Sequence, residues 1–116
     1  MAQEDVIARR YAKGLAEESR ANGTIVSVRR ELRILADIVD PRSGERHVPE
    51  FMRFLASPVA ETSEKFALAD SVSSKAGFGR EVASFLKVLI DHNRVDLIPR
   101  VARAFSEMAG PLTGVY

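Results

Sequence analysis

The sequence predicts an all-α fold, a bundle of six short helices, and two observations support this prediction. Apolar residues recur at spacings of three and four along almost every segment, which is the period of an amphipathic helix. No segment shows the sustained alternation of apolar and polar residues that is typical of a β-strand. The length of 116 residues, with 46% hydrophobic and 28% charged residues, indicates one soluble domain with a single core.

The first two helices are expected on either side of Asn22-Gly23, because both residues tolerate the left-handed conformation found at helix ends. Thr24 is then a suitable N-cap for the second helix. That helix should end at Asp40-Pro41, since proline pushes the preceding residue out of the helical region. Residues 41–47, PRSGERH, are predicted to be a loop. The two apolar stripes contain Val6, Ile7, Tyr11 and Leu15, then Ile25, Val28, Leu32, Leu35 and Val39.

The third and fourth helices are short. Pro49 fits the first position of the third, where its missing N–H would have no helical partner, and Ser57-Pro58 closes it. Thr62 or Ser63 is the expected N-cap of the fourth helix, which residues 76–79, AGFG, interrupt. Their apolar residues are Phe51, Phe54 and Leu55, then Phe66, Ala69 and Val72.

The stretch at residues 85–105 reads as the fifth and sixth helices rather than one long helix. Asn93 suits a left-handed helix end, Asp96 suits an N-cap, and Pro99 then falls in the first turn. The tail at residues 109–116 contains two glycines and a proline, so we expect it to be extended or disordered. The apolar residues are Val82, Leu86, Leu89 and Ile90, then Leu97, Ile98, Val101, Ala104, Phe105 and Met108.

The sequence contains no motif of an enzyme. It has no cysteine, hence no disulfide, thiolate nucleophile or cysteine zinc site, and Gly77 and Gly79 lack the rest of a phosphate-binding loop. His47 is expected to be solvated in its polar loop. His92 is expected at a helix C-terminus, where a cation is favourable, with a partner contact as the alternative. We therefore expect a non-enzyme with no cofactor and no metal site.

Charge and hydropathy give no sign of nucleic-acid binding or of membrane insertion. The net charge is only +1, and acidic residues interleave with the basic cluster, which consists of Arg29, Arg30 and Arg33 together with Arg9, Arg10 and Lys13. No apolar run approaches the ~20 residues of a membrane span. The N-terminus has no apolar signal-peptide region, so the chain is expected to stay where it is made.

Val88 is predicted to lie outside the core, whereas spacing alone favours Tyr11 as an amphipathic residue at the edge of the core, with an outward position as the alternative. At ~100° per residue, Val88 points roughly 140° away from the apolar centre of the fifth helix, with Ser84 and His92 beside it and Phe85 at the border. On the first helix the apolar arc covers about half the circumference, more than the ~100° a surface helix needs, so its edge around Tyr11 can face outward. Together these surfaces suggest a groove that holds a partner helix.

Three segments resemble one known family, the delta subunit of rotary ATP synthase, also called the oligomycin-sensitivity-conferring protein. They are ARRYAKGLAE at residues 8–17, FLASPVAETSEKFAL at 54–68 and FLKVLIDHNRVDLIPRVARAF at 85–105. The resemblance implies a six-helix N-terminal domain at residues 1–107. In the family, this domain holds the amphipathic N-terminal helix of an alpha subunit in a groove between its first and fifth helices.

Carried over to this sequence, the resemblance gives a set of partner-binding residues. They are Ala8, Tyr11, Gly14 and Leu15, facing Ser84, Phe85, Val88 and His92. Residues 108–116 would begin a linker to a C-terminal segment that binds the b subunit of the peripheral stalk, so stalk binding is expected of that missing segment. The expected place is the cytoplasmic face of the membrane, peripherally, within the ATP synthase complex. The alternative is a generic helix-in-groove adaptor.

Overall fold

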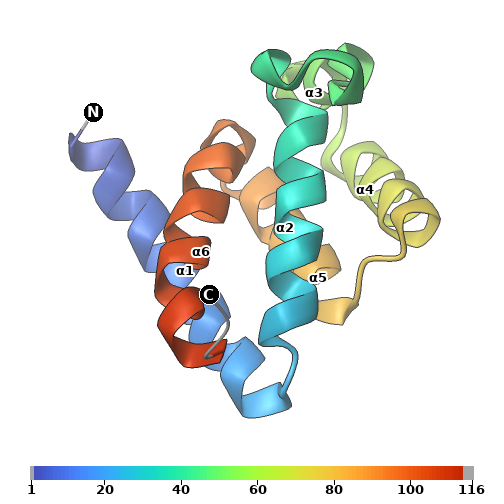
Figure 1. Cartoon of the computed structure of the whole chain (residues 1–116). Helices are drawn as coiled ribbons and strands as arrows, with labels where there is room; N and C mark the ends of the chain where they lie inside the picture. The colour runs from blue at the N-terminus through green and yellow to red at the C-terminus, as the bar shows by residue number, and fades with distance from the viewer. Residues whose placement is uncertain (1, 114–116) are drawn as a thin grey trace.

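The computed structural model describes residues 2–113, with the side chains of residues 3–110. Within residues 2–113 the chain forms six α-helices and two short 3₁₀-helices, η1 and η2, and no strand, so the all-α prediction is confirmed (Figure 1). The elements are α1 (Ala2–Asn22), α2 (Ile25–Val39), η1 (Pro41–Arg46), α3 (Pro49–Ala56), α4 (Thr62–Ala76), α5 (Arg80–Asp91), η2 (Val95–Leu97) and α6 (Ile98–Thr113).

The core forms around α6, which lies between α1 and α2 (Figure 1). Its inward face contributes Ile98, Val101 and Phe105, which are completely buried. Truncating a buried phenylalanine to alanine typically costs about 3–5 kcal/mol. This buried face therefore holds the three helices together.

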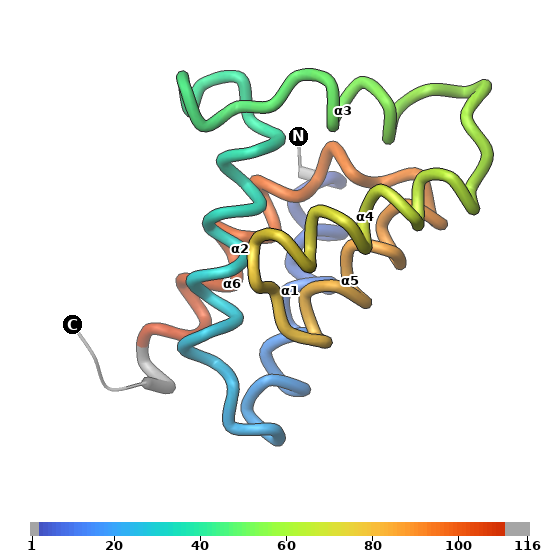
Figure 2. Tube along the Cα trace, turned by 90° about the vertical axis from the view of Figure 1, so that its right-hand side faces the viewer, coloured from blue at the N-terminus to red at the C-terminus, as the bar shows by residue number. Residues whose placement is uncertain are grey.

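The helices α4 and α5 lie side by side, and α3 crosses one end of the molecule (Figure 2). α5 also packs against both α1 and α2. Its inward residues Val82, Leu86 and Leu89 are completely buried. α5 is thus part of the core on one side, and α1 and α5 meet along one face of the bundle.

Three helix boundaries follow from residues in the left-handed conformation, as predicted. Gly23 has φ 71° between α1 and α2, and Gly77 has φ 75° after α4. Asn93 has φ 57° after α5 and is the one non-glycine residue with positive φ in the described part of the chain. Asparagine tolerates this conformation better than most residues, which explains why the helix ends here.

The start of α4 differs from the prediction. Its N-cap is Glu61, so Thr62 and Ser63 already lie within the helix. The backbone N–H of Glu61 donates to Oε1 of Glu64 at 3.0 Å. This bond is half of a capping box, and it satisfies a backbone donor at the start of the helix that has no partner within the helix.

Residues 41–46, predicted as a loop, form two short 3₁₀ turns, together labelled η1, on either side of Gly44, whose φ of 71° and ψ of -121° are not helical. The carboxylate of Asp40 accepts hydrogen bonds from the backbone N–H of Arg42 at 3.0 Å and from its Nε at 3.1 Å. These bonds hold the pKa of Asp40 below its usual range. His47 is half-buried, with Nδ1 3.0 Å from the carbonyl oxygen of Ile38, so the prediction that it is solvated was wrong.

The tail also differs from the prediction, because α6 continues through Gly110 and Pro111 to Thr113. Ala109 is completely buried, which anchors the last turns on the core. A proline this close to a helix end removes one backbone bond without breaking the preceding helix. The part of the predicted tail at residues 114–116 lies outside the described residues. Among the described helices, none has the combination of length and apolar character that crossing a membrane requires.

Candidate functional site

A groove follows the face where α1 and α5 meet. Its middle part has a cavity volume of about 260 Å³ and is lined by Tyr11, Gly14 and Leu15 of α1 and by Ser84, Phe85 and Val88 of α5. One end shares Arg10 and Tyr11 with a hollow of about 760 Å³. The other end shares Glu18 and Glu81 with a hollow of about 330 Å³. These three adjoining hollows together are called the α1–α5 groove.

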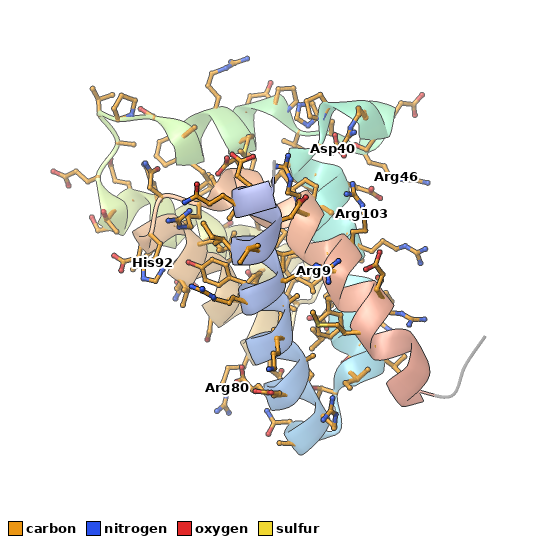
Figure 3. The ribbon with its side chains drawn as sticks, turned by 90° about the vertical axis from the view of Figure 1, so that its left-hand side faces the viewer. Arg9, Asp40, Arg46, Arg80, His92 and Arg103 are labelled. Atoms are coloured by element: carbon orange, nitrogen blue, oxygen red, sulfur yellow. The ribbon has the colours of Figure 1, made fainter. Side chains whose placement is uncertain are left out.

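Figure 3 views this face with α1 running down the centre. His92 and Arg80, on the α5 side of α1, mark the two ends of the groove. Tyr11 crosses between the helices, and its hydroxyl is 2.9 Å from Nδ1 of His92. The same ring meets Phe85 edge-on, with centroids 6.0 Å apart and planes at 71°. These two contacts fix the spacing of α1 and α5 before any ligand arrives.

Val88 is 41% exposed, whereas Leu86 and Leu89 beside it on α5 are 0% exposed. The helical-wheel prediction that Val88 lies outside the core is therefore confirmed. A single exposed valine is ordinary on a protein surface. Val88 is different in that it borders a concave surface whose floor is apolar, with Leu15 and Phe85 nearly buried beneath it.

Gly14 leaves the middle of the groove open. It is exposed, and a Cβ added at this position would meet nothing within 4 Å. No other segment among the described residues uses the space beside it. The glycine is thus not explained by packing inside this chain.

The structure brings together seven of the eight residues predicted for the groove. The exception is Ala8, which is only 1% exposed and lies on another side of α1. It lines a small hollow with Arg100 and Ala104 of α6. The placement of Ala8 in the groove was wrong because the wide apolar arc of α1 serves two neighbours. Its alanine side packs toward α6, and its Tyr11 side faces α5.

The sequence interpretation did not assign any of the charged residues at the ends of the groove to the site. Arg10 and Arg94 line one end, and Glu18 and Glu81 line the other. Arg10 and Glu18 lie four residues on either side of Gly14, a spacing that places all three on one helix face. From that spacing, the sequence could have predicted that Arg10 and Glu18 line the groove. Nothing in the sequence predicted the position of Arg94, because it follows α5 and is placed by the turn at Asn93.

Two carboxylates tie the start of α5 to the rest of the bundle. Oε2 of Glu81 accepts from Oγ1 of Thr24 at 2.6 Å and from Nδ2 of Asn22 at 3.0 Å. The hydrogen bond from Thr24, more than that from Asn22, lowers the pKa of Glu81. Glu31, which is buried, accepts from the backbone N–H of Gly79 at 2.9 Å. Thr24 thus precedes α2 as predicted, but its hydroxyl bonds to Glu81 instead of capping the helix.

The family model described as ATP synthase delta (OSCP) subunit matches residues 7–115. The chain belongs to this family. It is 39% identical over 107 residues to the ATP synthase subunit delta of Nitrobacter winogradskyi, a match that covers 90% of this chain and 53% of that protein. Against the subunit delta of Rhizobium rhizogenes the identity is 31% over 108 residues, covering 93% of this chain and 54% of that protein.

A plant relative gives a similar result. The chain is 29% identical over 103 residues to the chloroplastic ATP synthase delta chain of Nicotiana tabacum, covering 89% of this chain and 39% of that protein. The chain therefore spans about half the length of the bacterial delta relatives it matches and less of the chloroplast protein. Membership of the delta family agrees with the resemblance found in the sequence.

Proposed function

We propose that this chain is a non-catalytic stator module of an ATP synthase, and that its α1–α5 groove holds the amphipathic N-terminal helix of an alpha subunit of the catalytic head. The observation that carries the proposal is the exposed Val88 beside an open, apolar trough between α1 and α5. A trough of this kind suits a helix that lays its own apolar face into it.

The size of the groove fits such a ligand. α5 has 12 residues, and at about 1.5 Å per residue it is roughly 18 Å long. A partner helix alongside it would make contact over about three turns. Interfaces of this size depend on a few well-packed anchors, so the partner should place large apolar side chains over Val88 and Phe85.

A rigid groove helps such a small interface. The Tyr11–His92 hydrogen bond and the bonds to Glu81 set the position of α5 in the unliganded chain. A site already in its bound form loses less conformational freedom when the ligand arrives. The mechanism we propose is thus burial of a helix in a preorganised site, with no chemical step.

We propose that a different part of the family protein attaches the catalytic head to the peripheral stalk. This chain spans about half of its bacterial delta relatives. Contact with the b subunit would belong to the C-terminal segment beyond it. The chain itself would be a peripheral component on the cytoplasmic face of the membrane.

The proposal can be tested by calorimetry with a synthetic peptide of the N-terminal helix from the matching alpha subunit. We expect Val88→Asp to fold normally and to lower the affinity by about 2 kcal/mol or more, since it removes a central anchor. Val26→Asp is a matched control, because Val26 is 64% exposed on α2 and should leave the affinity unchanged.

Three outcomes would count against the proposal. A melting temperature that collapses in Val88→Asp would place this residue in the core. Equal binding of an unrelated amphipathic helix would indicate the alternative, a generic helix-in-groove adaptor. No binding of the alpha-subunit peptide would exclude the proposed partner.

A further inference from the structure

The hollow at one end of the α1–α5 groove is basic. It is lined by Ile7, Arg10, Tyr11, His92 and Arg94, and no acidic side chain is among its lining residues. It adjoins the apolar middle of the groove through Arg10 and Tyr11. A ligand that occupies the middle of the groove and extends in this direction therefore meets positively charged groups.

The guanidinium groups of the two arginines are not used by the fold. Among the residues whose side chains the structure describes, no ion pair or side-chain hydrogen bond involves Arg10 or Arg94. Lys87 of α5, by contrast, is paired within the chain, since its Nζ is 2.7 Å from a carboxylate oxygen of Asp70 on α4. Two unpaired guanidinium groups beside one hollow can accept a carboxylate from outside with little rearrangement.

The backbone places these groups together. The N–H of His92 donates to the carbonyl of Val88 at 3.0 Å and closes the last turn of α5. The left-handed Asn93 then reverses the chain, so that the N–H of Arg94 donates to the carbonyl of Leu89 at 2.8 Å. Tyr11 occupies Nδ1 of His92, which leaves Nε2 as the ring nitrogen available to a ligand.

The opposite end of the groove has the other sign. Glu18 and Glu81 line it, although Arg80 lies at the same end and offsets part of their charge. The groove is thus basic at one end, apolar in the middle and more acidic at the other. Such a gradient distinguishes the two directions in which a helix could lie.

We propose that Arg10, His92 and Arg94 form a carboxylate-binding subsite for the partner helix and that this subsite fixes the helix direction. This inference rests on the proposed function, because the carboxylate belongs to the same partner helix that is proposed to occupy the groove. The partner would carry an Asp or Glu about one to two helical turns from the apolar residue over Val88, since Val88 and His92 are one turn apart on α5.

Free phosphate or a nucleic acid would also be attracted to two arginines. The structure favours a protein helix, because the basic hollow continues into an apolar trough rather than into a longer basic surface. Inorganic phosphate therefore serves as a competitor in the test below.

The test is a charge-reversal cycle with the full chain and the alpha-subunit peptide. Arg10→Glu should weaken binding of the unmodified peptide about tenfold or more. Each acidic residue of the peptide is then changed to Lys in turn. We expect one of these peptides to bind Arg10→Glu better than it binds the unmodified chain. Arg30→Glu is the control, because Arg30 is exposed on α2 and does not line the groove.

The outcomes separate this inference from the proposed function. If Val88→Asp weakens binding but no Lys-substituted peptide recovers affinity for Arg10→Glu, the groove is correct and the carboxylate subsite is wrong. If the peptide does not bind at all, both fail. Binding of millimolar phosphate at Arg10 without competition against the peptide would also overturn the subsite. Should Arg10→Glu fold poorly, Arg10→Gln must still weaken binding and lower its salt dependence.

Discussion

At the scale of single residues, a helical wheel correctly predicted that Val88 lies outside the core, whereas the family resemblance incorrectly placed Ala8 in the groove. The wheel gives the direction of a side chain relative to its own helix. It does not say which neighbouring helix covers each side. α1 contacts both α5 and α6, and only the structure shows that Ala8 lies on the α6 side. The prediction for Val88 succeeded because α5 has one apolar stripe, and the placement of Ala8 failed because the apolar arc of α1 faces two neighbouring helices.

Gly14 gives a residue-scale prediction. Glycine within a helix costs about 1 kcal/mol relative to alanine, and a Cβ here would meet nothing within 4 Å. Gly14→Ala should therefore stabilise the chain by up to about 1 kcal/mol in urea unfolding. Gly14→Leu should also fold normally, but its side chain would enter the groove and weaken the alpha-subunit peptide. Destabilisation by Gly14→Ala, or unchanged peptide affinity in Gly14→Leu, would contradict this view of the groove.

At the scale of the elements, the positions of the six α-helices could be predicted because their ends carry strong local signals. Gly23, Gly77 and Asn93 are such signals, and each has positive φ. What holds α5 in place could not be predicted. Glu31 and Glu81 bond to groups 48 and 57 residues away in sequence. Such hydrogen-bonded pairs form only when the helices pack together. The period of the apolar residues predicts each helix but not which helices become neighbours.

Glu81 gives an element-scale prediction about pH. Its pKa is lowered from 4.5 in the folded chain, so its contribution to stability is complete above 4.5 and is lost as pH falls through the lowered folded value. Glu81→Gln should reduce the free energy of unfolding by about 0.5–1.5 kcal/mol at pH 7. The difference from the unmodified chain should shrink on acidification below pH 4.5.

Urea unfolding at several pH values measures this difference. Glu17→Gln is the control, since Glu17 is exposed on α1 and should show no such trend. If the free energies of unfolding of Glu81→Gln and the unmodified chain instead differ by the same amount from neutral to acid pH, the ionised carboxylate does not hold the start of α5.

At the scale of the whole molecule, the residues that stabilise the bundle and those proposed to bind the partner lie in different places. The core lies where α6 packs between α1 and α2, whereas the groove lies on the outer side of α1 and α5. The sequence predicted the all-α class and this groove. It missed the 3₁₀-helices and the extension of α6 to Thr113, because these depend on packing and on single hydrogen bonds rather than on apolar period.

The most direct test of the central claim is to map the backbone amide shifts of the ¹⁵N-labelled chain while the unlabelled alpha-subunit peptide is added. The chain offers a competing surface, an apolar hollow of about 410 Å³ lined by Val39, Met52 and Pro99 among others. If the groove binds the helix, the largest changes will fall in residues 7–18 and 81–94. If they instead cluster around Val39, Met52 and Pro99, the α1–α5 groove is not the binding site.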